Sequence, residues 1–121
     1  EYIITDGGMN DLLRPSHYDA YHAVEAVQER DEHSVVDVVG PVCESGDFFA
    51  LDREVEDVEV GDLVVVRTAG AYGYVMSSNY NARPRVAEVL VDGDRFAVVT
   101  RRESYEDLVR LEPEHLDWRN G

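Results

Sequence analysis

The chain has 121 residues, 44% of them hydrophobic, which is enough for one domain with its own core. Its 26 acidic residues stand against 11 basic residues, all of them arginine, and the formal net charge is -15. Such a charge repels nucleic acid and anionic membranes and argues against both as partners. The acid-rich, lysine-free composition favours a protein adapted to high salt, although a generic solvated acidic surface explains it equally well.

The chain carries a single cysteine, Cys43, which excludes an internal disulfide. It lacks the basic and then apolar start that is typical of a secretory signal. No apolar run approaches the roughly 20 residues that a membrane-spanning helix needs. The sequence therefore predicts a soluble, cytoplasmic protein.

The first third of the chain reads mainly as strands joined by turns. Residues 1–5 have strand character from the first residue, which indicates a fragment cut from a longer protein. Residues 10–15 form a short helical turn or loop, in which the proline disfavours helix at Arg14. Residues 18–30 alternate imperfectly and fit a strand or an amphipathic helix. We favour a strand, because the apolar run 35–39 follows after a polar turn and completes a hairpin.

Further strand signals occupy the middle of the chain. Residues 48–51 resume a buried pattern, and the acidic residues 52–57 read as an exposed connection. Residues 63–66 are a continuous apolar run, rich in β-branched side chains, that suits a strand buried on both faces.

The last third predicts a hairpin and a short helix. Residues 85–91 and 95–101 are joined by the turn signal Asp92-Gly93. Ser104 followed by a carboxylate three residues later is typical of a helix start, and the tail 114–121 reads as a loosely held end. The whole pattern is mainly β: one domain over 1–121, built as a small barrel or sandwich with one or two short helices.

The loop at residues 40–47 presents the cysteine between two strand-like runs. Gly40 and Pro41 end one run, and the turn at 45–47 precedes the next. A lone cysteine is often a small buried hydrophobe, but the flanking acids Glu44 and Asp47 favour an exposed, reactive thiol at Cys43.

Other chemistry finds weaker support. The four histidines and Cys43 show no paired spacing of the kind that zinc sites use, so no metal site is predicted. Nothing in the sequence places a histidine beside Cys43 for nucleophilic catalysis. The small-residue loop at 70–73 is not followed by the lysine and hydroxyl pair of a phosphate-binding loop.

Several segments together resemble the C-terminal β-domain of the diaminopimelate decarboxylases, pyridoxal-phosphate (PLP) enzymes of the alanine racemase-like fold type. The segments are 5–15 (TDGGMNDLLRP), 39–47 (VGPVCESGD), 61–62 (GD) with 69–73 (AGAYG), and 76–81 (MSSNYN) with 83–84 (RP). They follow the family's order nearly end to end. Glu44 favours the diaminopimelate branch, because the related ornithine and arginine decarboxylases usually carry Asp there. Gly7 stands where the family usually has alanine, a small departure that leaves the resemblance intact.

The resemblance implies a two-domain enzyme that forms homodimers. In this family an α/β barrel domain holds the cofactor through a lysine, and the β-domain of the facing subunit completes the active site. The present chain has no lysine, so alone it is expected to be inactive. The implied reaction is decarboxylation of meso-2,6-diaminoheptanedioate to L-lysine. The alternatives are a related decarboxylase acting on another basic amino acid or carboxylated polyamine, and a stand-alone acidic assembly module.

The resemblance also implies a role for each matching side chain. Cys43 would return a proton to the α-carbon after carbon dioxide leaves, a task that suits a thiol. Glu44 would hold the distal ammonium of the substrate, and Arg14 its distal carboxylate. Tyr18 would add a hydroxyl contact at that end. Tyr72 would touch both cofactor and substrate.

Each assignment has a plainer alternative. Arg14 could simply pair with Asp6 or Asp11, and the two tyrosines could be amphipathic edges of the core. Glu44 could be one more solvated acid. For three further residues of the matching loop we expect a structural or dimer-contact role: Asn79, Tyr80 and Arg83.

Overall fold

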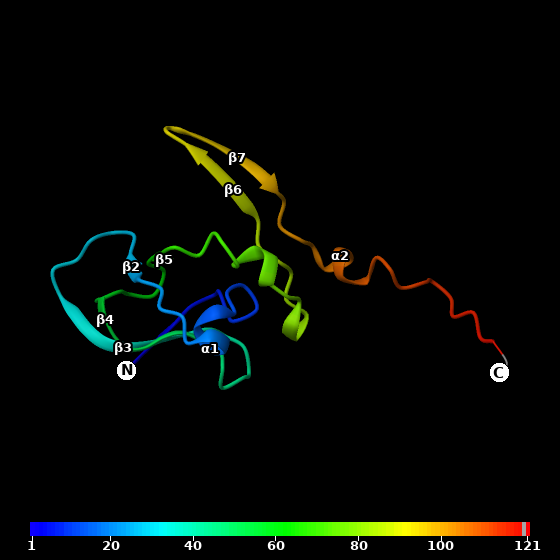
Figure 1. Ribbon diagram of the computed structural model, residues 1–121, viewed down its shortest axis with the longest axis horizontal. Coiled ribbons are helices and arrows are strands. Elements are labelled where there is room, and N and C mark those ends of the chain that lie inside the picture. The colour runs from blue at the N-terminus through cyan, green and yellow to red at the C-terminus, as the bar shows by residue number, and fades with distance from the viewer. Residues whose placement is uncertain (120) are drawn as a thin grey trace.

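The computed structural model describes residues 1–119 and 121, and over these residues the fold is mainly β (Figure 1). The elements are β1 (Tyr2–Ile4), α1 (Arg14–Tyr18), β2 (Val24–Ala26), β3 (His33–Val39), β4 (Phe48–Glu56), β5 (Val64–Val66), the 3-10 turns η1 (Tyr74–Met76) and η2 (Tyr80–Ala82), β6 (Glu88–Asp92), β7 (Arg95–Thr100) and α2 (Tyr105–Val109). The predicted mainly β class is confirmed. The sheets found in the described part are small and separate, in the orders β1-β3-β4, β2-β5 and β6-β7, without a closed barrel. None of the described helices is long and apolar enough to cross a bilayer.

The core lies on the β3–β4 sheet. β3 pairs in parallel with β1 and antiparallel with β4. Alternate residues of β3 point inward, and Val38 is 0% exposed, while in β4 Val55 is 1% exposed. The buried cluster consists of Leu12, Val24, Val36, Val38, Phe49, Ala50 and Val55. These contacts anchor the two ends of the loop at 40–47, which connects β3 to β4.

The helix α1 begins within residues 10–15, where the sequence predicted a short helical turn or loop, and ends at the first residue of the segment predicted as a strand. Pro15 lies in the first turn of α1, where a backbone N–H has no partner within the helix and proline is tolerated. The prediction that Pro15 keeps Arg14 out of a helix is therefore wrong. The helix ends at Tyr18, because Asp19 takes a left-handed conformation with φ of 50°.

The predicted hairpin between 18–30 and 35–39 is also wrong. Only Val24–Ala26 is a strand, and it pairs antiparallel with β5 rather than with β3. An alternating pattern gives the face of each side chain but not the identity of the neighbouring strand.

Two further expectations about the middle of the chain need correction. The acidic segment 52–57 is not a connection, because β4 continues to Glu56 and buries Val55 while its acids stay at the surface. The run 63–66 is not buried on both faces, since Val64, Val65 and Val66 are half-buried and Leu63 is exposed.

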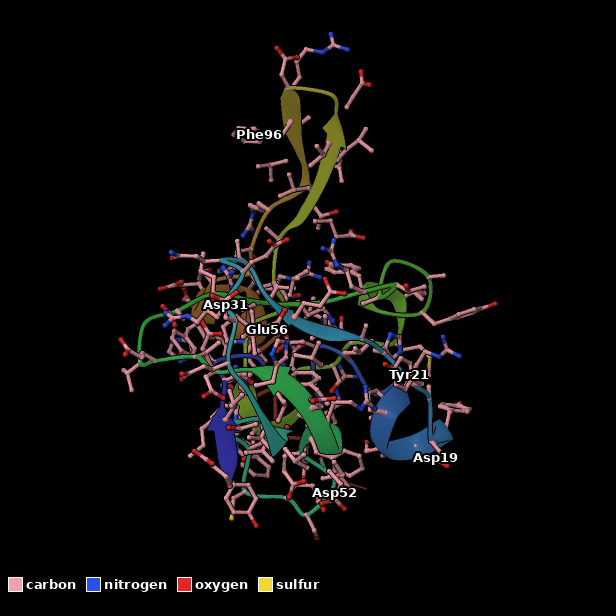
Figure 2. The ribbon with its side chains drawn as sticks, turned by 90° about the vertical axis from the view of Figure 1, so that its left-hand side faces the viewer. Asp19, Tyr21, Asp31, Asp52, Glu56 and Phe96 are labelled. Atoms are coloured by element: carbon pink, nitrogen blue, oxygen red, sulfur yellow. The ribbon has the colours of Figure 1, made fainter. Side chains whose placement is uncertain are left out.

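The predicted hairpin and helix in the last third are confirmed. β6 and β7 pair antiparallel across a turn in which Gly93 has φ of 62°. The hairpin projects from the rest of the chain, with Phe96 pointing outward (Figure 2). At the start of α2, the amide of Ser104 donates to the carboxylate of Asp107 at 2.8 Å, as the capping pattern predicted.

The buried β4 valine should contribute strongly to stability. We expect Val55→Ala to lower the free energy of unfolding by about 2 kcal/mol, because two buried methyl groups are lost and a cavity remains. Val60→Ala is the control, since Val60 is fully exposed. Denaturant unfolding of the two variants checks this, and equal midpoints would contradict the assignment of the core.

Candidate functional site

The loop that carries Cys43 is fixed by one buried carboxylate. Asp47 is 5% exposed and accepts hydrogen bonds from the amide of Met9 at 2.6 Å and the amide of Val42 at 2.5 Å. The amide of Gly40 donates to the carbonyl of Asp47 at 3.0 Å, which closes the base of the loop. Asp47 thus ties the loop at 40–47 to the segment that precedes α1.

Glycine is required beside this carboxylate. A Cβ at Gly40 would lie 2.5 Å from both carboxylate oxygens of Asp47, closer than any van der Waals contact allows. A Cβ at Gly8 would lie 3.0 Å from the nearer oxygen. Gly8 and Gly40 therefore both serve close packing around Asp47.

The tip of the loop presents Cys43 and Glu44 to solvent. Cys43 is a free, exposed cysteine, so the reading of this residue as a small buried hydrophobe is wrong. The amide of Glu44 donates to the carbonyl of Val42 at 2.8 Å, which keeps the turn tight. The Glu44 carboxylate accepts a hydrogen bond from the hydroxyl of Tyr80 at 3.2 Å.

Arg14 and Tyr72 form a second group. The Arg14 guanidinium lies over the Tyr72 ring, 5.7 Å from its centroid, within cation–π range. Tyr72 has φ of 60°, a left-handed conformation that costs free energy in a residue other than glycine. Among the described residues Arg14 makes no ion pair. Instead Arg83 contacts the carbonyl of Asp6 at 2.5 Å and approaches the carboxylate of Asp11 at 4.0 Å.

Tyr18 lies one helical turn beyond Arg14 in α1. Residues four apart lie on the same side of a helix, so the two side chains can reach a common ligand. Tyr18 is 64% and Tyr72 60% exposed, so neither side chain forms an edge of the core.

The loop that follows η1 packs against the segment before α1. The amide of Ser78 donates to the carbonyl of Asn10 at 2.9 Å. The Asn79 side chain donates to the Glu103 carboxylate at 2.7 Å, and the Arg85 guanidinium contacts Glu103 at 3.1 Å. The backbone amide of Arg85, and then Asn79, hold the pKa of Glu103 below its usual range. Asn79 and Arg83 thus have structural contacts of the expected kind, and a dimer contact stays a prediction.

A cavity of about 650 Å³ opens between α1, the loop at 40–47 and the loop that follows η1. Its lining includes Met9, Asn10, Leu13, Ser16, Glu44 and Tyr80. Asn10 is 2% exposed, and its side-chain oxygen has no hydrogen-bond partner among the residues that the structure describes. Glu44 is the one predicted site residue that lines this cavity. Tyr80 was not predicted to line a cavity, and its only signal was its place in the matching MSSNYN segment.

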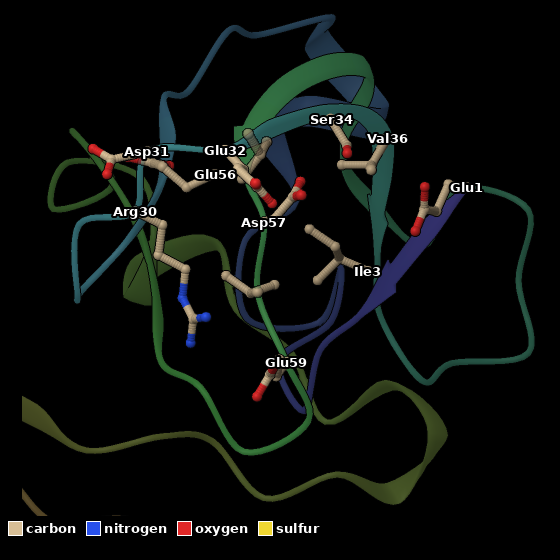
Figure 3. A pocket seen from close by; sticks show the side chains of 12 residues that line it. Glu1, Ile3, Arg30, Asp31, Glu32, Ser34, Val36, Glu56, Asp57 and Glu59 are labelled. Atoms are coloured by element: carbon tan, nitrogen blue, oxygen red, sulfur yellow. The ribbon is translucent and has the colours of Figure 1, made fainter.

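A second cavity, of about 630 Å³, lies apart from these residues beside β1 and the end of β4 (Figure 3). Its lining is strongly acidic and includes Glu1, Asp31, Glu32, Glu56, Asp57 and Glu59. Within residues 1–119 and 121, no group of three or more His, Cys, Asp or Glu side chains is arranged to hold a metal ion.

Comparison with known proteins decides the family. A family model described as pyridoxal-dependent decarboxylase, C-terminal sheet domain, matches residues 1–70. The chain belongs to this family. The matched residues include Arg14, Tyr18, Cys43 and Glu44. The resemblance stated from the sequence is therefore confirmed.

Two curated relatives are both diaminopimelate decarboxylases. The diaminopimelate decarboxylase of Aquifex aeolicus is 53% identical over 109 residues, which cover 89% of this chain and 26% of that protein. The diaminopimelate decarboxylase of Archaeoglobus fulgidus is 52% identical over 119 residues, covering 95% of this chain and 28% of that protein. The chain thus spans little more than a quarter of the length of these relatives.

Solved structures agree in fold. A diaminopimelate decarboxylase from M. jannaschii superposes with a TM-score of 0.89 at 42% identity, covering 95% of this chain and 27% of that one. The Helicobacter pylori enzyme complexed with L-lysine superposes with a TM-score of 0.86 at 46% identity, and the match covers 92% of this chain and 28% of that one. A lysine/ornithine decarboxylase from Vibrio vulnificus complexed with cadaverine superposes with a TM-score of 0.62 at 26% identity. This match covers 70% of this chain and 23% of that one.

The packing around Asp47 predicts that a single methyl group will disturb the loop. We expect Gly40→Ala to lower the free energy of unfolding by about 2 kcal/mol, because the new Cβ forces the buried carboxylate away from its amide donors. Gly70→Ala is the matched control, since a Cβ there meets nothing within 4 Å. Denaturant unfolding compares the two variants, and equal stabilities would show that the loop tolerates the displacement of Asp47.

Proposed function

We propose that this chain is the C-terminal domain of a diaminopimelate decarboxylase, whose complete form converts meso-2,6-diaminoheptanedioate to L-lysine. The main support is the contrast among relatives. Diaminopimelate decarboxylase structures reach TM-scores of 0.86 to 0.89, whereas the lysine/ornithine decarboxylase reaches 0.62. The Helicobacter pylori structure was solved with L-lysine, the proposed product.

The family's dependence on pyridoxal phosphate fits a completing role for this chain. When bound, the cofactor stabilises the negative charge that remains on the α-carbon after carbon dioxide departs. The chain has no lysine, so any covalent link to the cofactor belongs to another part of the complete protein. Tyr72, exposed and stacked with Arg14, is the residue of this chain that we assign to contact the cofactor and substrate.

Cys43 is assigned the protonation step. Loss of carbon dioxide breaks one carbon–carbon bond and leaves its electron pair on the α-carbon. The Cys43 thiol donates its proton there, forming the new C–H bond, and the resulting thiolate regains a proton from water. The exposed position of Cys43 on a braced loop supports this role, because the sulfur is free to enter a pocket built by a facing subunit.

The two charged groups at the distal end of the substrate are assigned to different side chains. Glu44 is assigned to the distal ammonium, an attraction that strengthens when a closed site excludes water. Arg14 is assigned to the distal carboxylate, with Tyr18 adding a hydroxyl contact one turn further along α1. The exposure of Tyr18 and the absence of an ion pair at Arg14 among the described residues leave both available for a ligand.

Mixing two inactive variants of the complete protein tests the shared site. One carries Cys43→Ala, and the other lacks the cofactor-binding lysine of its barrel domain. Each homodimer should be inactive, whereas random mixing should restore about a quarter of the wild-type activity, because half of the dimers then hold one intact site. The unmixed variants are the controls. No recovery in a mixture that demonstrably exchanges subunits would contradict a site shared between protomers.

A related decarboxylase with another substrate remains the second candidate, since the lysine/ornithine decarboxylase shares the fold over 70% of this chain. Arg14→Ala separates the two. Loss of a charge-assisted contact should lower kcat/KM for meso-2,6-diaminoheptanedioate by about 10- to 100-fold. Activity on a basic amino acid without a distal carboxylate should stay unchanged.

Arg95→Ala is the control for this comparison, because Arg95 lies in the projecting hairpin and pairs with Asp92. Steady-state kinetics with both substrates gives the ratio of kcat/KM for the wild type to that for each variant. An equal loss of kcat/KM on both substrates would show that Arg14 does not bind the distal carboxylate.

A further inference from the structure

The hydroxyl of Tyr80 joins two loops that are far apart in the sequence. It donates to a carboxylate oxygen of Glu44 at 3.2 Å across 36 positions of the chain. Both side chains line the cavity of about 650 Å³ beside α1. We propose that Tyr80 is a positioning residue, which holds the Glu44 carboxylate in the orientation that receives the distal ammonium of the substrate. This inference rests on the proposed function.

Glu44 needs such a partner because it stands at the tip of an exposed loop. The only other hydrogen bond that its carboxylate accepts in the described part comes from the amide of Gly46, at a long 3.4 Å. A free glutamate side chain samples many rotamers, and fixing it during binding costs conformational entropy. A second donor that restricts the carboxylate beforehand lowers this cost, which is the general benefit of preorganisation.

Tyr80 is itself held firmly. Its amide donates to the hydroxyl of Ser78 at 3.3 Å, and the amide of Ser78 donates to the carbonyl of Asn10 at 2.9 Å. Asn81 and Ala82 follow with φ of 60° and 55°, two consecutive left-handed residues without the freedom of glycine. Strained backbone of this kind persists only where the surroundings impose it, and it often accompanies functional sites.

The chemistry of a phenol suits this task. Tyr80 donates one hydrogen bond and leaves the remaining lone-pair positions of the carboxylate open for an ammonium group. Because the phenol is neutral, it does not cancel the negative charge that attracts the substrate, as an arginine or lysine would. The hydrogen bond from Tyr80 to Glu44 and the charge of Glu44, with smaller contributions from desolvation and from Cys43, raise the pKa of Tyr80. The phenol therefore stays protonated and remains a donor.

The test uses Tyr80→Phe in the complete protein. Removal of one oxygen should raise KM for meso-2,6-diaminoheptanedioate by about three- to tenfold, with kcat changed by less than about twofold. Tyr105→Phe is the matched control, because Tyr105 is 72% exposed in α2 and its hydroxyl has no hydrogen bond within the described residues. An unchanged KM in Tyr80→Phe, with the wild type active, would overturn the inference and leave the proposed function intact.

A second background separates positioning from a general structural effect. In a Glu44→Ala protein, Tyr80→Phe should raise KM no further, because the carboxylate that it orients is absent. An equal rise in both backgrounds would overturn the inference.

A spectroscopic titration examines the contact without turnover. The tyrosinate absorbance that disappears in Tyr80→Phe should titrate at a lower pH once Glu44 is replaced by alanine, and an unchanged titration would overturn the inference. A wild-type protein that does not decarboxylate meso-2,6-diaminoheptanedioate would instead contradict the proposed function.

Discussion

The buried carboxylate of Asp47 is the constraint on which the arrangement of the site depends. It accepts two short hydrogen bonds from backbone amides, one within its own loop and one from the segment before α1. A carboxylate buried to this degree is stable only with such donors. The same contacts exclude any side chain at Gly40. The position of the exposed thiol at Cys43 is therefore fixed by a residue that never needs to touch a substrate.

The candidate residues fall into two groups with different physical character. Arg14 and Tyr72 stack on each other, so a planar cation and an aromatic face are presented together. Glu44 is joined to Tyr80 by a hydrogen bond between two loops. A positive and a negative group held on separate supports match the proposed substrate, which carries both a distal carboxylate and a distal ammonium.

Local chemistry made the β6–β7 hairpin and the α2 cap predictable, because Asp92-Gly93 and Ser104 act on neighbours a few positions away. The pairing of β2 with β5 was not predictable, since strands so far apart in sequence carry no local record of each other. The resemblance to the family named Arg14, Cys43 and Glu44. It did not reveal the contact with Tyr80, which exists only once the two loops are folded against one another.

The projecting hairpin sets a condition on how copies of this chain behave in water. Val89, Leu90, Phe96 and other apolar side chains of β6 and β7 are more than half exposed. Exposed apolar side chains on a two-stranded sheet with unpaired edges favour association between molecules. The net charge of -15 opposes it at low ionic strength. Because salt shortens the range of that repulsion to about 10 Å or less, concentrated brine would weaken the barrier that keeps these hairpins from meeting.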